Sequence, residues 1–264
     1  MPCLFEFLGK ISSAGTREGH LTAPSGLGFD SQENLYVADE FLNSVSVFDP
    51  DGKFLRSWGK QGNSDGQFDN PSSLMIVDDV VFISDTLNNR IQKYDLNGTY
   101  IGGWGSEGSD NGQFNYPWGL TEGNDGDLYV ADWGNDRIQR FSMDGEYIST
   151  FKGEDSEIPI KRPAGVAVSS NGTLYVADWG NQILQVFDDK GKFLAKNRGE
   201  ADLSSWALEY FEAQQDEKAA RSSYVPVFAP DTEDVREISA RMESFFWDPC
   251  AVLVDSQEKV YVLE

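Results

Sequence analysis

The sequence contains very little histidine or cysteine. Its 264 residues include one histidine, His20, and two cysteines, Cys3 and Cys250. A catalytic zinc ion needs about three protein ligands, and a Ser-His-Asp triad needs a histidine as its base. Both would depend on His20, so we expect neither zinc catalysis nor a serine triad. The sequence predicts no metal site and no cofactor.

Long apolar runs and a secretory signal are also missing. No stretch of about 18 apolar residues occurs, which argues against a transmembrane helix. The segment 1–7 lacks the basic and apolar regions of a signal peptide, and two distant cysteines are not the framework of a small secreted domain. We therefore expect a soluble, cytoplasmic protein with no membrane partner.

Basic residues are scarce beside acidic ones. Lysine and arginine number 21, and aspartate and glutamate number 44, which gives a formal net charge of −23 at pH 7. A field of that sign repels the phosphate backbone of DNA or RNA. Nucleic acid is therefore not an expected partner.

A repeat organises most of the chain. Four prolines recur at intervals of 47, 46 and 46 residues: Pro24, Pro71, Pro117 and Pro163. Each begins a short apolar run, which is followed by a turn and then by a second apolar run. The second runs lie at 35–39, 81–85, 128–132 and 174–178, and third runs follow at 45–48, 91–94, 138–141 and 184–187. Self-similarity at a period of about 20 to 50 residues is typical of solenoids and propellers.

A tight turn and a fourth run complete each repeat. The turns are Asp51-Gly52, Asn97-Gly98, Asp144-Gly145 and Lys190-Gly191. Asn-Gly and Asp-Gly pairs favour hairpins because these residues tolerate positive φ. Each repeat is thus predicted to be a four-stranded antiparallel meander, which is the blade of an all-β propeller.

Several short motifs carry a resemblance to a known family. They are the Pro-x-Gly starts, the Tyr-Val-Ala-Asp strand ends, the segments 89–92 and 136–139, and Gly112-Gln113-Phe114 before Pro117. Together they resemble NHL repeats over residues 4–199 and 247–264. The resemblance implies one propeller domain over 1–264, commonly of six blades. It does not imply one activity, because propellers serve unrelated functions.

The two ends of the chain fit the same scheme. The segment 5–10 reads as a fourth strand, and 247–264 reads as the first half of a blade. We predict that the first completes the second, which would hide exposed strand edges. The count is then four full blades plus one that the two ends share.

One connection is far longer than the others. Gly199 and Pro249 are 50 residues apart, whereas Gly59 and Pro71 are 12 apart. Apolar residues recur at helical spacing at Leu203, Trp206, Ala207, Tyr210 and Phe211, which predicts an amphipathic helix. A second helix is predicted over 234–245. The helical insertion 200–246 has three open interpretations: a lid, a partner-binding element, or a plug in the space of a missing blade.

Alternating strand direction places two sets of connections on one face of the propeller, which we call the loop face. These are the connections between the second and third strands and those that lead to the next blade. The aromatic residues in them are Phe41, Trp118, Trp133, Trp179 and Trp247. Two interpretations stay open: an aromatic platform for a peptide, sugar or planar ligand, or packing between adjacent blades. These five, with Trp206, Tyr210 and Phe211 of the insertion, are the predicted ligand-binding residues.

An aspartate ends the second strand of every repeat. These residues, Asp39, Asp85, Asp132 and Asp178, suit turns in which the side chain binds the backbone. Asp85 with Arg90, and Asp132 with Arg137, are placed for structural ion pairs. We therefore predict a structural role for this ring of carboxylates.

The sequence favours a non-catalytic scaffold that binds a protein, peptide or small ligand through the loop face. The alternative is a calcium-dependent, lactonase-like hydrolase, because calcium needs only oxygen ligands and carboxylates abound. No Asp-x-Asp-x-Asp-Gly loop supports it.

Overall fold

The structure is a computed structural model that describes residues 10–199, 212, 214–216, 234–236 and 246–264. It contains a series of four-stranded antiparallel sheets, which are the predicted blades. Blade 1 consists of β1 (Pro24–Phe29), β2 (Leu35–Asp39), β3 (Ser44–Phe48) and β4 (Phe54–Trp58). Blade 2 consists of β5 (Pro71–Val77), β6 (Val80–Asp85), β7 (Arg90–Asp95) and β8 (Tyr100–Trp104).

Two more four-stranded blades and a two-stranded sheet follow. Blade 3 consists of β9 (Pro117–Glu122), β10 (Leu128–Asp132), β11 (Arg137–Phe141) and β12 (Tyr147–Phe151). Blade 4 consists of β13 (Pro163–Val168), β14 (Leu174–Asp178), β15 (Ile183–Phe187) and β16 (Phe193–Asn197). The last sheet consists of β17 (Ala251–Val254) and β18 (Val260–Leu263), and the 3-10 turns η1 (Thr86–Asn88) and η2 (Trp133–Asn135) follow β6 and β10.

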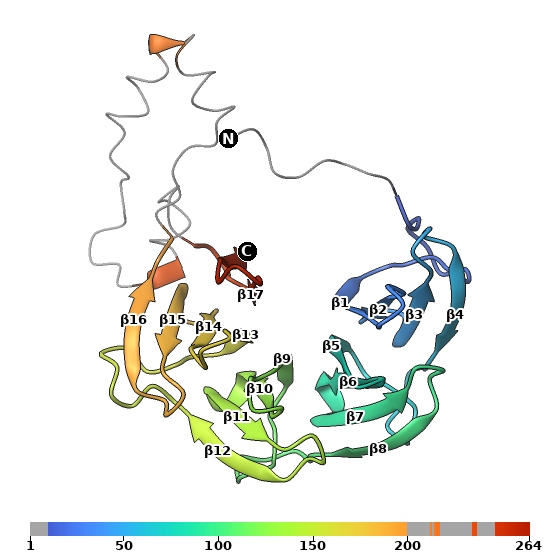
Figure 1. Ribbon diagram of the computed structural model, residues 1–264, viewed down its shortest axis with the longest axis horizontal. Coiled ribbons are helices and arrows are strands. Elements are labelled where there is room, and N and C mark those ends of the chain that lie inside the picture. The colour runs from blue at the N-terminus through green and yellow to red at the C-terminus, as the bar shows by residue number, and fades with distance from the viewer. Residues whose placement is uncertain (1–9, 200–211, 213, 217–233, 237–245) are drawn as a thin grey trace.

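The blades lie side by side around a central axis, with the first strand of each innermost and the fourth outermost (Figure 1). The predicted meander is confirmed in all four blades. The segment 5–10, predicted to complete the last blade, lies outside the described residues except for Lys10. No helix of the described residues is long and apolar enough to span a membrane.

Apolar side chains fill the spaces between neighbouring blades. Blades 1 and 2 enclose Tyr36, Phe68 and Tyr94, and blades 2 and 3 enclose Phe114 and Phe141. All five side chains are fully buried. Burial of one such side chain contributes about 1.5–3 kcal/mol, so the contacts between blades hold the arc together.

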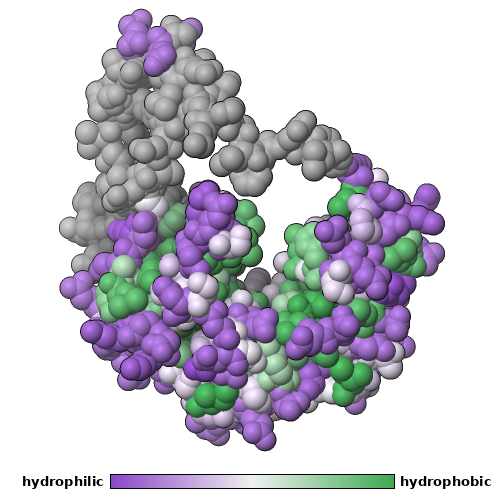
Figure 2. Space-filling view, viewed as in Figure 1, coloured by the Kyte–Doolittle hydropathy of each residue, from purple (hydrophilic) through white to green (hydrophobic). Residues whose placement is uncertain are grey.

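One side of blade 1 has no described blade next to it, and apolar residues that are buried between the other blades are exposed there. Leu74 of blade 2 is 4% exposed, whereas Leu27, at the equivalent position in blade 1, is 64% exposed. Phe29 is also 64% exposed, and Leu253 of β17 is 63% exposed. Figure 2 shows apolar surface where the first and last described blades face the opening of the ring, and polar residues over most of the remaining surface.

The glycine of the Pro-x-Gly motif allows the inner strands to approach each other. A Cβ atom at Gly119 would lie 2.6 Å from the Ala164 carbonyl oxygen, and one at Gly165 would lie 2.8 Å from the Ala251 Cα atom. Neither glycine is at positive φ. The motif is therefore required for close approach rather than for a turn.

A repeated hydrogen bond, which we call the blade latch, joins each blade to the next. The backbone N–H of the residue before each proline donates to a side-chain oxygen in the preceding blade. The pairs are Asn70 to Asn43 (2.7 Å), Tyr116 to Asn89 (2.9 Å), Arg162 to Asp136 (2.8 Å) and Asp248 to Gln182 (2.7 Å). All eight residues have φ between 49° and 58°. The last latch shows that β17 and β18 follow blade 4 in register, despite the insertion before them.

Candidate functional site

The ring of aspartates anchors the loop face. Asp85 Oδ1 accepts a hydrogen bond from the Asp69 backbone N–H (2.7 Å), and Asp85 Oδ2 accepts one from Arg90 Nε (2.7 Å). Asp132 makes the same contacts with Asn115 N (2.8 Å) and Arg137 Nε (2.7 Å). The predicted ion pairs and the structural role are confirmed.

Blade 4 lacks this arginine. Ile183 stands where blades 2 and 3 carry arginine. Asp178 keeps the bonds from Asn181, Gln185 and the Lys161 N–H, whose equivalents in blade 3 also bind Asp132. Burial raises the pKa of Asp178 to about 6, although the hydrogen bonds from Asn181 and Gln185 lower it. Burial also raises the pKa of Asp132.

All four carboxylates of the ring are completely buried, at 0% exposure. They are bonded to the protein's own loops and have no exposed surface. No group of three or more His, Cys, Asp or Glu side chains in the described part of the chain is arranged to hold a metal ion.

Three tryptophans of the loop face form a continuous row across blades 3 and 4. The ring centroids of Trp118 and Trp133 are 6.3 Å apart, and those of Trp133 and Trp179 are 5.8 Å apart. Tyr116 meets Trp133 edge-on at 6.3 Å. The three indoles are half-buried and Tyr116 is 40% exposed. We call Tyr116, Trp118, Trp133 and Trp179 the aromatic row.

Two arginines lie against the aromatic row. The Arg162 guanidinium is 4.9 Å from the ring centroid of Trp133 and 5.9 Å from that of Trp179. Arg236, which belongs to the insertion, lies 4.3 Å from the ring centroid of Trp179 and forms an ion pair with Asp248 (2.6 Å). The insertion thus contributes a side chain to the loop face.

The central channel begins beside the row. Trp118 lines a cavity of about 110 Å³ together with Ser25 and Ser72, near the start of β1 and β5, and Cys250, which precedes β17. Further along the axis a cavity of about 330 Å³ is lined mostly by apolar residues, including Leu27 and Met75. The row therefore stands at the rim of a narrow channel.

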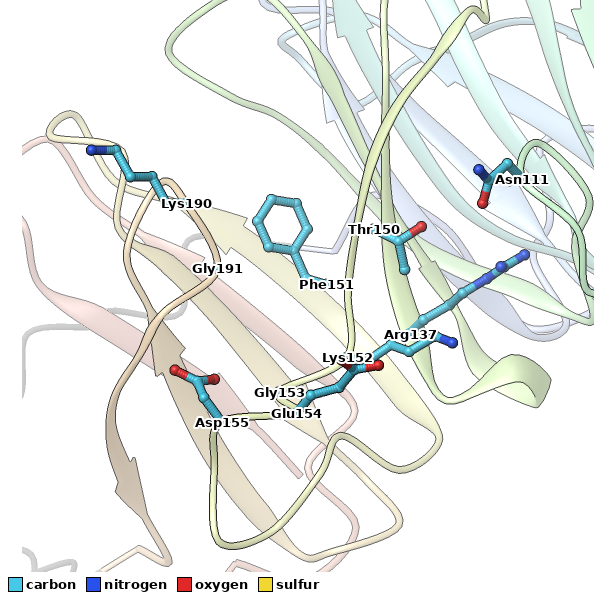
Figure 3. A pocket seen from close by; sticks show the side chains of 10 residues that line it. All are labelled: Asn111, Arg137, Thr150, Phe151, Lys152, Gly153, Glu154, Asp155, Lys190 and Gly191. Atoms are coloured by element: carbon cyan, nitrogen blue, oxygen red, sulfur yellow. The ribbon is translucent and has the colours of Figure 1, made fainter.

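A third cavity lies away from the axis, between blades 3 and 4, with a volume of about 390 Å³. Its lining comes from β12, the loop after it and the turn between β15 and β16, with Arg137 of β11 and Asn111 of the loop before β9 (Figure 3). Lys190 and Arg137 point to opposite sides of it (Figure 3). Arg137 is already paired with Asp132. The polar groups of this cavity do not converge on a common point.

The structure brings together some of the predicted ligand-binding residues. Trp118, Trp133 and Trp179 are in contact, and the contact between Trp133 and Trp179 also joins two blades. Phe41 and Trp247 are 65% and 57% exposed and contact no other aromatic ring among the described residues. Trp206, Tyr210 and Phe211 lie outside the described residues, as does most of the insertion. Residues 212, 215, 216, 235 and 236 are helical.

Sequence reasoning missed Tyr116, Arg162 and Arg236. Tyr116 and Arg162 directly precede Pro117 and Pro163, so the repeat alignment offered a signal for them. Arg236 had none, because its contact depends on the path of the insertion.

Comparisons with known proteins agree with this architecture. The model of the NHL repeat matches residues 114–141 and 161–187, and that of a six-bladed β-propeller matches residues 27–105. The chain contains NHL repeats. In sequence, it is 32% identical over 68 residues to the protein Brain tumor of Drosophila melanogaster, a match that covers 26% of this chain and 7% of that protein.

Solved structures similar to this NHL propeller include enzymes. Virginiamycin B lyase from Staphylococcus aureus, solved with quinupristin, has a TM-score of 0.51 and 20% identity, over 66% of this chain and 55% of the lyase. A gluconolactonase from Xanthomonas campestris has a TM-score of 0.56 and 14% identity, over 91% of this chain and 68% of that one. The chain thus spans little more than half of the lyase. At these identities the likeness shows the fold alone.

Proposed function

We propose that this NHL propeller binds a protein or peptide through the aromatic row on its loop face. The observation that carries the proposal is the contact of Trp118, Trp133 and Trp179 across two blades, with each indole still partly exposed. Aromatic side chains offer a large contact area with little loss of conformational freedom, which suits a binding surface.

The rigidity of the row supports the proposal. Trp133 and Trp179 directly follow the buried Asp132 and Asp178, whose carboxylates are bonded to both loops of the same blade. The backbones that display the indoles are therefore fixed before a ligand arrives. A preorganised surface binds more tightly because less entropy is lost on binding.

The test is a selection from a library of random linear peptides displayed on phage, with the wild-type protein immobilised. Selected peptides should lose most of their affinity for Trp133→Ala and Trp179→Ala. Removal of a central aromatic residue from an interface costs about 2 kcal/mol or more. Ile148→Ala is the control, because Ile148 is an exposed residue of β12 outside the row. Recovery of no peptides, or equal binding to the tryptophan variants, would refute the proposal.

A further inference from the structure

Arg162 lies on the loop face with its backbone held in place. Its backbone N–H is held by Asp136 (2.8 Å), and Pro163 follows it. The carbonyl of Lys161 accepts a hydrogen bond from the Gly180 N–H (2.9 Å). The backbone is thus fixed on both sides, and the side chain lies over Trp133 and Trp179.

The guanidinium of Arg162 differs from those of three arginines in blades 2 and 3. Arg90, Arg137 and Arg140 each form an ion pair with an aspartate. Arg162 is exposed, and its side chain has no hydrogen bond or ion pair with any described residue. Its five N–H donors stay available in a planar fork that matches a carboxylate. Contact with two indoles positions this fork and leaves its edges open.

The same face also carries exposed carboxylates. Asp65 and Asp110 are exposed in its loops, Asp136 is exposed where it accepts the latch bond of Arg162, and the chain as a whole carries −23. A uniformly acidic peptide would be repelled by this field, whereas flanking cations would be attracted. Arg162 and the carboxylates of the surrounding loops therefore favour a ligand of mixed charge.

We propose that Arg162 binds one aspartate or glutamate side chain of a peptide that is otherwise basic and places an apolar or aromatic residue on the row. This inference rests on the proposed function and specifies its ligand. The acidic residue sets the register of the peptide, the apolar residue contacts Trp133 and Trp179, and flanking lysines or arginines face the acidic loops.

The test repeats the peptide selection on wild type and on Arg162→Glu. Wild type should enrich an acidic residue next to an apolar one, with basic residues on either side. Arg162→Glu should enrich lysine or arginine at the acidic position. For one peptide chosen on wild type, Arg162→Gln should weaken binding about tenfold to a hundredfold, as expected for loss of a hydrogen bond between charged groups.

The control is Lys190→Glu, which makes the same change of charge in the turn between β15 and β16, on the opposite face of blade 4. It should leave the selected sequences unchanged. Urea unfolding of each variant verifies that it is folded. Two outcomes would overturn this inference and leave the proposed function intact. In one, the selected peptides depend on the tryptophans but show no acidic position. In the other, wild type and Arg162→Glu select the same peptides. Failure to select any peptide would overturn both.

Discussion

The pH dependence of stability should reveal the raised pKa of the Asp178 carboxyl group. This group has a pKa of about 6 in the folded protein and an ordinary value of 3.8. Between these values the folded state holds a proton that the unfolded state has released, so the free energy of unfolding rises as the pH falls through 6. The full effect of this shift is ~3 kcal/mol, of which ~1.4 kcal/mol should develop between pH 8 and pH 5.

The measurement compares wild type with Asp178→Asn by urea unfolding at both pH values. The amide cannot titrate, so the free energy of unfolding of wild type minus that of the variant should increase by ~1.4 kcal/mol from pH 8 to pH 5. Any constant cost of the amide cancels in this difference. Asp189→Asn is the control for loss of one negative charge, because Asp189 is exposed in the turn of the same blade. A difference that stays the same at both pH values would refute the reasoning.

Two further predictions concern the contacts between and within blades. Arg137→Ile should lower the free energy of unfolding by about 3–5 kcal/mol, because it removes the positive charge that pairs with the buried Asp132 and the donor to the carbonyls of Ser109 and Asp110. Arg140→Ile, which breaks a more exposed pair, should cost about 1 kcal/mol or less, and equal losses in urea unfolding would contradict the assignment. Gly119→Ala should lower the free energy of unfolding by about 1–3 kcal/mol, because its Cβ atom would meet the Ala164 carbonyl oxygen at 2.6 Å. Thr121→Ala on the same strand is the control. A Gly119→Ala protein as stable as this control would show that the inner strands can separate.

The fold was predictable because one unit of sequence repeats with its turns. The predicted second strand 35–39 matches β2 (Leu35–Asp39), and the predicted third strand 45–48 lies within β3 (Ser44–Phe48). The second and third strands of each four-stranded blade are short and mostly buried, and their bounds follow from the glycine turns and the terminal aspartate. The blade latch was not predicted, because it joins residues of different repeats that share only a backbone conformation.

The candidate site was predictable only in part. Trp133 and Trp179 occupy the same position in two adjacent repeats, so the repeat alignment alone places them near each other. Their contact with Arg162 depends on the latch, which fixes where the residue before Pro163 lies. The insertion is a different case, because nothing in its local sequence indicates that Arg236 meets Trp179.

The position before each proline is the strongest link between the fold and the proposed ligand. The latch uses only the backbone N–H of this residue, so the side chain is free to vary from blade to blade. Its left-handed conformation costs a residue other than glycine or asparagine roughly 1–2 kcal/mol, yet Tyr116 and Arg162 occupy it at φ 57° and 49°. Both side chains contact Trp133 and lie outside the core. The backbone conformation at this position disfavours tyrosine and arginine, but a binding surface would use their side chains. Selection for function is expected to override selection for stability at such a position.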